Sequence, residues 1–142
     1  MTVRDIMNKN VVTVTQDTDV VAVSELMARE DVGCVPVVSG GRVEGMLTDR
    51  DIVLRCVAKG RDPMLCTVGE IMTRSAAYVY ADQTVEDAAG MMGAEQVRRL
   101  PVLDKGNLAG MVTLSDIAKK HQQDVEVAEA LAEITTPYRL FS

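Results

Sequence analysis

The chain has 142 residues, a length that allows one domain of ordinary size or two very small ones. Asp and Glu outnumber Lys and Arg by 21 to 15, and the net charge of −6 disfavours non-specific electrostatic binding to nucleic acid or to an anionic membrane. With 47% hydrophobic and 25% charged residues, the composition is typical of a folded globular protein and excludes a disordered or membrane-spanning chain.

The first elements predicted along the chain are a strand and a helix. Residues 11–15 are all β-branched and predict the strand. Positions 17–19 then offer three oxygen-bearing side chains as candidate helix caps. The helix that follows carries apolar residues at helical spacing, namely Val20, Val23, Leu26 and Met27.

A hairpin and a second helix come next. Two short apolar strands, residues 34–38 and 43–47, are joined by a turn at 39–42 that contains two glycines. The helix begins at position 48 or 49 and continues to Gly60, a residue suited to the end of a helix. This half of the chain therefore has the order β-α-β-β-α.

The chain is an internal duplication. A shift of 65 residues aligns positions 3–52 with positions 68–117 without a gap, and 17 of these 50 positions are identical. The sequence therefore predicts an α+β fold with two β-α-β-β-α repeats. Since a unit of about 60 residues is marginally stable alone, we expect the copies to form one compact module around a pseudo-twofold axis. The hydrophobic seam between them would then supply most of the core.

The repeats predict where the chain divides. The first repeat covers residues 1–62, the second covers 63–123, and residues 124–142 form an acidic helix and a tail. The apolar positions of that helix suggest docking or dimer contacts, and a partly frayed tail remains the alternative.

A Gly-x-x-Thr-x-x-Asp motif occurs in both repeats, at positions 45–51 and 110–116, where a strand turns into a helix. At such a junction glycine permits close backbone approach, free N–H groups and the threonine hydroxyl favour an anion, and the aspartate can accept hydrogen bonds from ribose hydroxyls. This arrangement suits a nucleotide. The alternative interpretation is that threonine and aspartate only cap the helix.

These motifs, together with the Val35-Pro36-Val37 and Leu100-Pro101-Val102 strands, closely resemble the cystathionine-β-synthase (CBS) domain. The resemblance covers residues 3–123 and implies a stand-alone CBS pair, or Bateman module. It further implies a non-catalytic regulatory protein that binds AMP, ADP, ATP, S-adenosylmethionine or NAD in clefts between its repeats. Such a module requires no cofactor, commonly forms a homodimer, and signals to an effector protein that the sequence does not identify.

The resemblance also implies roles for individual residues. Asp51 and Asp116 would hold the ribose, and Thr48 and Thr113 would lie on the phosphate side. Backbone groups would flank the base at Val12, Thr13, Val35, Pro36, Ala77, Tyr78, Leu100 and Pro101.

The phosphate-binding positions differ between the two repeats. Family members often carry basic residues just before the hydrophobic-Pro pair, and the second repeat has Arg98-Arg99 there whereas the first has Gly33-Cys34. We therefore expect the cleft that receives the two arginines to bind a phosphate tail more strongly. Since clefts in the family draw from both repeats, the resemblance also allows this cleft to be the one that contains Asp51. Arg50 would partly compensate in the other cleft, and its counterpart is the uncharged Ser115.

Three other functions are weighed against this interpretation. An enzyme is disfavoured because the only histidine, His121, lies in a polar stretch and no catalytic motif is present. A zinc or redox role would use Cys34, Cys56 and Cys66, which are dispersed and form no CxxC pair. A dimeric scaffold with empty clefts is the third possibility.

Two further expectations concern the cysteines and the location of the protein. We expect mostly buried, reduced thiols, with Cys66 in the connector between repeats as the most exposed. The charged N-terminus lacks the apolar run of a signal peptide, so we expect a cytoplasmic protein.

Overall fold

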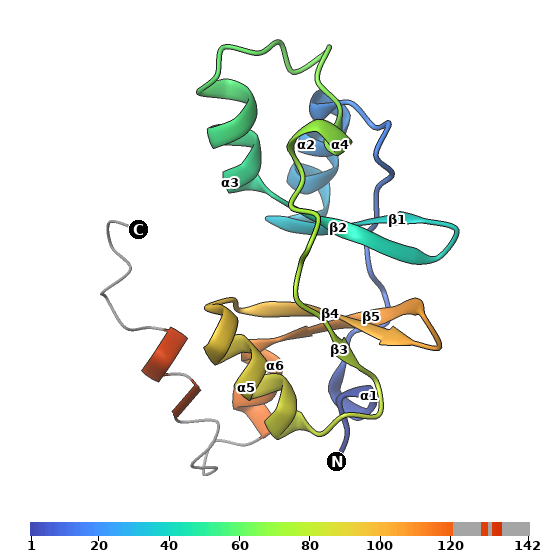
Figure 1. Cartoon of the computed structure of the whole chain (residues 1–142), viewed down its shortest axis with the longest axis vertical. Coiled ribbons are helices and arrows are strands. Elements are labelled where there is room, and N and C mark those ends of the chain that lie inside the picture. The colour runs from blue at the N-terminus through green and yellow to red at the C-terminus, as the bar shows by residue number, and fades with distance from the viewer. Residues whose placement is uncertain (121–128, 131, 135–142) are drawn as a thin grey trace. The chain divides into compact units, whose positions relative to one another are not determined.

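A computed structural model describes residues 1–120, 129–130 and 132–134 (Figure 1). It contains both helices and strands, as predicted. In chain order the elements are α1 (Val3–Ile6), α2 (Val20–Glu30), β1 (Cys34–Ser39), β2 (Arg42–Thr48), α3 (Asp49–Ile52), the π-helix η1 (Val53–Val57), α4 (Val68–Ile71), β3 (Val79–Tyr80), α5 (Val85–Glu95), β4 (Arg99–Asp104), β5 (Asn107–Thr113) and α6 (Leu114–Lys120).

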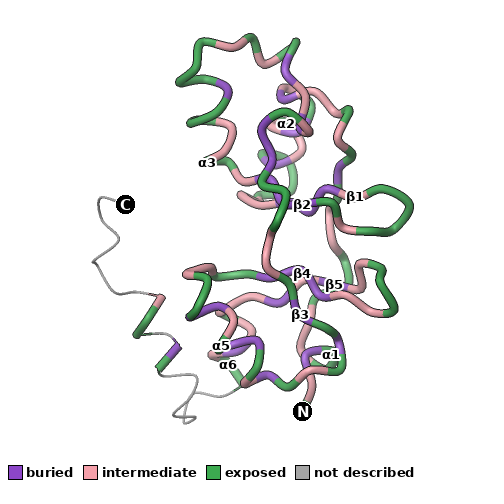
Figure 2. The backbone as a smooth tube through the Cα atoms, viewed as in Figure 1, coloured by how far each residue is buried: buried purple, intermediate pink, exposed green. Residues whose placement is uncertain are grey.

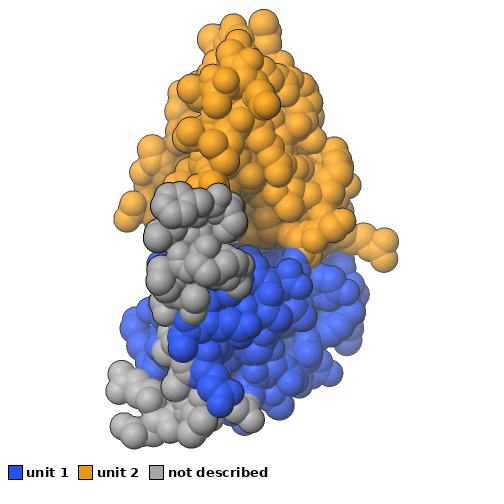
Figure 3. All heavy atoms as spheres, turned by 60° about the vertical axis from the view of Figure 1, so that its left-hand side comes forward, with its two compact units in different colours: residues 1–10, 77–142 blue, residues 11–76 orange. Residues whose placement is uncertain are grey.

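The chain forms two compact units whose boundaries cut across the repeats. Unit 1 combines Met1–Asn10 with the chain from Ala77 onward, and unit 2 comprises Val11–Ala76 (Figure 3). The opening segment of the first repeat therefore belongs to the unit built around the second repeat. The opening segment of the second repeat, with α4, belongs to the unit built around the first.

Backbone hydrogen bonds hold each exchanged segment in place. In unit 1, Asn8 and Met111 exchange two N–H···O bonds of 2.8 and 2.9 Å. In unit 2, Thr73 and Met46 exchange two bonds of 2.9 Å. Since these pairs occupy matching repeat positions, both units are completed in the same way by a segment of the other repeat.

The predicted hairpins are present in both units. β1 pairs with β2, and β4 pairs with β5, in antiparallel registers. The two-residue turn between β1 and β2 has positive φ angles of 57° and 84° at Gly40 and Gly41, which matches the right-handed twist of the strands. Lys105 and Gly106 form the corresponding turn with φ angles of 53° and 82°.

The first strand of each repeat is shorter than predicted. In unit 2 the β-branched run 11–15 is reduced to a parallel bridge between Val14 and Val37. In unit 1 only Val79–Tyr80 forms a strand, which pairs in parallel with β4. Both segments follow directly after the point where the chain passes from one unit to the other, so only their last residues pair with the hairpin.

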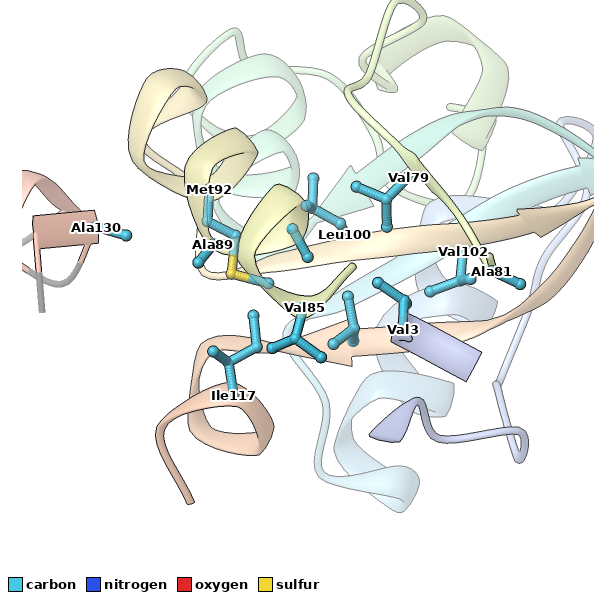
Figure 4. Close-up of a cluster of buried hydrophobic side chains, with 12 residues drawn as sticks. Val3, Val79, Ala81, Val85, Ala89, Met92, Leu100, Val102, Ile117 and Ala130 are labelled. Atoms are coloured by element: carbon cyan, nitrogen blue, oxygen red, sulfur yellow. The ribbon is translucent and has the colours of Figure 1, made fainter. Parts of the chain in front are cut away.

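Buried apolar residues form two clusters, one within each unit, so the expectation that a seam between the repeats supplies most of the core is wrong (Figure 2). The exchanged segments explain the difference, because each covers the apolar face of the other repeat. In unit 1, Val3 of α1 lies with Val79 and Val102 in one cluster (Figure 4). In unit 2, Val68 and Ile71 of α4 are buried in the other.

The helices of the first repeat begin where the sequence predicts, but the second of them does not continue as an α-helix to its predicted end. Asp19 caps α2 by accepting a 2.8 Å hydrogen bond from the N–H of Ala22. The helix expected to run to Gly60 changes at Val53 into the π-helix η1, where the N–H of Ala58 bonds to the Val53 carbonyl at 2.8 Å. Cys56 is buried on this wider turn.

The predicted C-terminal helix is described only at residues 129–130 and 132–134, which are helical. Ala130 is buried in the core of unit 1, and the side-chain amide of Gln96 donates a 2.8 Å hydrogen bond to the Glu133 carbonyl. The remaining positions of the predicted helix and tail lie outside the described residues.

Replacing Gly45 or Gly110 with Ala tests the exchanged segments. A Cβ at Gly110 would lie 2.7 Å from the Asn8 carbonyl oxygen, and one at Gly45 would collide with that of Thr73. We expect each substitution to lower the free energy of unfolding by about 1–3 kcal/mol in urea denaturation.

Gly90 provides the matched control, because a Cβ there meets nothing within 4 Å. Gly90→Ala should raise the stability by about 0.5–1 kcal/mol, as in an ordinary helix interior. Equal effects at all three glycines would contradict the proposed close approach.

Candidate functional site

The predicted ligand-binding residues fall into two sets, one in each unit. We call the predicted residues of unit 2 the first candidate half-site: Val12, Thr13, Val35, Pro36, Thr48, Arg50 and Asp51. Those of unit 1 are the second candidate half-site: Ala77, Tyr78, Arg98, Arg99, Leu100, Pro101, Thr113, Ser115 and Asp116.

Sheet pairing brings the members of the first half-site together. Cys34 pairs with Thr48 across the hairpin, so the threonine lies beside the start of β1. The parallel bridge between Val14 and Val37, in which the Val14 N–H donates to the Pro36 carbonyl at 3.1 Å, brings the segment 11–15 to β1. Val12 and Thr13 lie just before this bridge, outside any strand.

The second half-site is assembled by equivalent pairings. Arg99 pairs with Thr113, and β3 pairs in parallel with β4 with Val79 opposite Val102, so Ala77 and Tyr78 lie just before the paired residues. Leu100 and Pro101 are buried residues, as are Val35 and Pro36. Little of their surface is exposed, 0% for Val35 and 1% for Leu100.

Thr48 and Asp51 form a reciprocal capping box at the start of α3. The Asp51 N–H donates to the Thr48 hydroxyl at 3.1 Å, and the Thr48 N–H donates to Asp51 Oδ2 at 3.0 Å. Thr113 and Asp116 repeat the arrangement at 3.1 and 3.0 Å. Both motifs therefore cap a helix, yet each cap uses only one carboxylate oxygen, and Oδ1 can still accept a bond from another donor.

The glycine of each motif has a structural role. Gly45 and Gly110 face the carbonyls of the exchanged segments, where a larger residue would collide. The close approach that sequence reasoning assigned to a ligand is thus made by the chain itself.

The environment of the two half-sites differs in charge. Arg98 and Arg99 are exposed, and neither forms an ion pair within the part of the chain that the structure describes. At the equivalent place in unit 2, the Asp49 carboxylate lies against Gly33, so that a Cβ there would be 2.9 Å from Oδ2. The first half-site therefore carries an added negative charge, which sequence reasoning missed because Asp49 is replaced by Leu114 in the second repeat.

Tyr80 is a further residue that sequence reasoning missed. Its ring packs edge-to-face on Tyr78 with a centroid separation of 5.4 Å, and their hydroxyls lie 3.3 Å apart. The hydrogen bond with Tyr78 raises the pKa of Tyr80. Both rings are over 40% exposed, at 41% and 46%. Their i, i+2 spacing in an extended segment is the signal that places them on one face.

Arg55 also escaped the sequence analysis, although its i, i+4 spacing from Asp51 was visible. Its Nε lies 3.9 Å from Asp51 Oδ1, and its Nη1 donates bonds of 3.1 Å to the carbonyls of Ile71 and Met72. The side chain of Asp51 is 13% exposed and that of Arg55 is 50% exposed.

The cysteines differ from expectation at one position. Cys66, expected to be the most exposed, is 1% exposed, and Cys56 is fully buried. Burial raises the pKa of the Cys66 thiol, whose neighbours include Arg61 and Cys56. Among the described residues, no three potential metal ligands cluster, and His121 lies outside those residues.

The family model of the CBS domain matches residues 3–57 and 68–122. The chain belongs to the CBS-domain family. CBS-domain proteins are generally regulatory and non-catalytic. Within the described part of this CBS pair, no helix has the length and apolar character required to cross a membrane.

Several relatives share nearly the whole length of this CBS pair. It is 38% identical over 133 residues to the CBS domain-containing protein YhcV of Bacillus subtilis, covering 94% of both chains. It also resembles the crystal structure of Hypoxic Response Protein I with two coordinated zinc ions, with a TM-score of 0.78, 39% identity, and coverage of 84% and 98% of the respective chains.

A third similar structure contains adenosine compounds. It is the CBS domain pair of protein MJ0100 in complex with 5′-methylthioadenosine and S-adenosyl-L-methionine. The TM-score is 0.75 and the identity 25%, with coverage of 86% of this chain and 96% of that one.

Removing the threonine of a capping box should destabilise the protein. We expect Thr48→Ala and Thr113→Ala each to lower the free energy of unfolding by about 1 kcal/mol, because an N–H at the helix start loses its acceptor. The Ser variants keep the hydroxyl and should retain most of the stability. Equal losses for Ala and Ser in thermal denaturation would exclude the cap as the cause.

The thiols should react with Ellman's reagent in two phases at neutral pH. Half-buried Cys34 should react first. Cys56 and Cys66 should react only when the structure around them opens locally, because both are buried and the pKa of Cys66 is raised. All three should react rapidly in denaturant. Fast labelling of native Cys34→Ser protein would show that this description of the buried pair is wrong.

Proposed function

We propose that this CBS pair is a regulatory module that binds an adenosine-containing ligand through its two half-sites and signals to a partner protein. The observation that carries the proposal is the duplicated capping box, in which a carboxylate is held by one oxygen and keeps the other for a donor. A ribose diol supplies two such donors. The adenosine compounds bound by the CBS pair of MJ0100 support the same chemistry.

The base and the phosphates would be held by different parts of the half-sites. Backbone groups at residues 12–13, 35–36, 77–78 and 100–101 would flank the adenine, and the exposed ring of Tyr78 offers an aromatic face. Arg98 and Arg99 would bind phosphate oxygens, since they are exposed charges of like sign that an anion would neutralise. Asp49 would oppose phosphate at the first half-site, where Arg50 is the exposed cation that offsets it.

AMP, ADP, ATP, S-adenosylmethionine and NAD all present the ribose and adenine that this site would recognise. The difference in charge between the half-sites favours a phosphate-bearing ligand where Arg98 and Arg99 contribute. We therefore propose unequal affinities, with no catalysis and no required cofactor.

Assembly and signalling complete the proposal. Several large apolar side chains of unit 2 are exposed, including Val53, Leu54 and Val57 of η1. We infer that such side chains contribute to a homodimer, because burying them in a contact with a second copy removes apolar surface from water. The effector would be a separate protein, and we propose that the module acts in the cytoplasm.

Zinc is the alternative ligand that a relative suggests, because Hypoxic Response Protein I was crystallised with two zinc ions. In residues 1–120, 129–130 and 132–134 of this chain, no group of three His, Cys, Asp or Glu side chains is arranged to hold a metal. The adenosine ligand therefore has the stronger structural support, and zinc serves as a comparison in the same experiment.

The proposal is tested by thermal shift and calorimetry with AMP, ADP, ATP, S-adenosylmethionine, NAD and zinc. A ligand at about 100 times its Kd should stabilise the folded state by about 2.7 kcal/mol. Asp51→Asn and Asp116→Asn keep a capping oxygen but lose the charge, so each should weaken binding at its own half-site about tenfold.

Arginine variants separate phosphate binding from nucleoside binding. Replacing Arg98 and Arg99 with Ser should weaken AMP and leave 5′-methylthioadenosine, which has no phosphate, unchanged. Arg42→Ser, at an exposed position beside the β1–β2 turn, is the matched control. A response to no adenosine compound would contradict the proposal and favour a scaffold, and a response to zinc alone would favour a metal-binding module.

A further inference from the structure

Arg55 connects the candidate ribose acceptor to the exchanged segment of unit 2. Its guanidinium lies 3.9 Å from Asp51 Oδ1 through Nε, and Nη1 donates to the carbonyls of Ile71 and Met72, each at 3.1 Å. Asp51 belongs to the first repeat, whereas Ile71 and Met72 belong to the opening segment of the second. One side chain therefore contacts both the half-site and the segment that completes the unit.

The two carbonyls that Arg55 contacts are at the end of α4, where a helix leaves its last carbonyls without helical partners. The next residue, Thr73, is fixed to Met46 by two hydrogen bonds, and unit 2 ends at Ala76. Arg55 thus acts at the start of the short stretch that leads out of unit 2. A change at Asp51 that alters the position of the Arg55 guanidinium therefore also alters its hydrogen bonds to Ile71 and Met72, at the start of this stretch.

The second repeat lacks this connection. The residue equivalent to Arg55 is Lys120, the last residue of α6. Within the described part of the chain, Lys120 forms no ion pair with Asp116 and no hydrogen bond to the end of α1. The flexible ammonium of lysine also cannot reproduce the planar fork with which arginine contacts several acceptors.

We propose that Arg55 is a positioning residue that links ligand binding at Asp51 to the restraint of α4. Asp51 Oδ2 is engaged by the Thr48 N–H, so Oδ1 is the oxygen that a ribose hydroxyl would take. Oδ1 is also the anionic partner of Arg55. A ligand that bonds to Oδ1 weakens the attraction that helps to position Arg55, and the hydrogen bonds of Arg55 to the carbonyls of Ile71 and Met72 weaken with it.

The expected effect is modest because the ion pair is long and the Arg55 side chain is half exposed. Pairs of this kind change equilibria by about two- to fivefold. This inference rests on the proposed function, since it requires a ribose at Asp51. It adds a route by which only the first half-site would alter the segment between the units.

The free protein provides the first test, by hydrogen exchange measured with NMR. The N–H groups of Met72 and Thr73 are bonded to the carbonyls of Val68 and Met46 and report on the end of α4. Arg55→Met should speed their exchange about two- to fivefold and leave the amides of β1 unchanged. The matched variant Lys120→Met should not affect the equivalent amides, those of Met7 and Asn8.

The second test adds 5′-methylthioadenosine, which carries the ribose diol without a phosphate, and uses 2′,3′-dideoxyadenosine as the control without the diol. In the unmodified protein, the first compound should speed exchange at Met72 and Thr73 and the second should not. In Arg55→Met this response should disappear, whereas Arg55→Lys, which keeps the charge, should retain part of it. A merely structural role of Arg55 would leave the response to the compound unchanged.

The outcomes separate the two proposals. Binding of 5′-methylthioadenosine by calorimetry without any change in exchange, or an unchanged response in Arg55→Met, would overturn the role of Arg55 and leave the proposed function standing. If no adenosine compound binds, the proposed function is overturned, and so is the proposal that a ligand weakens the restraint of α4. Unaltered exchange in free Arg55→Met protein would overturn the restraint of α4 whatever the ligand result.

Discussion

The exchange of opening segments between the repeats is the constraint on which the rest of the structure depends. Each hairpin accepts backbone hydrogen bonds from the other repeat, at Asn8 with Met111 and at Thr73 with Met46. The approach is so close that only glycine fits opposite, at Gly45 and Gly110. Neither repeat is therefore a complete unit alone, because its apolar face is covered by a short helix of the other copy. The duplication is thus a structural requirement as well as a pattern in the sequence.

In the proposed function, the same atoms of each capping box would stabilise a helix and bind the ligand. Each motif aspartate fixes the start of a helix with one oxygen, which orients the carboxylate, and its second oxygen takes no part in the cap. A site built in this way needs little reorganisation to accept a donor. It also means that loss of binding in a truncated variant reports on folding as well as on ligand contact, so isosteric changes are more informative than Ala substitutions.

The two units share one backbone plan but differ in charge around it. Unit 1 presents Arg98 and Arg99, while unit 2 has Asp49 beside Gly33. Unit 2 alone, among the described residues, ties its motif aspartate to an exchanged helix through an arginine. After the duplication, the charged side chains around the two motifs have therefore diverged. The glycines that face the exchanged segments have been kept in both repeats. Such a division allows two half-sites with unlike ligand preferences and unlike effects on the chain.

The sequence by itself determined the duplication, the α+β class, the hairpins with their turns, and the helix that starts at Val20, because local periodicity and turn chemistry carry that information. It also identified the motif residues, which the structure finds in matching capping boxes. Only the tertiary structure decided which hairpin each opening segment joins, since both copies have the same pattern and either pairing satisfies it. For the same reason the roles of Gly45 and Arg55 were hidden: their partners lie in a segment far along the chain, and contact between distant segments has no local signature.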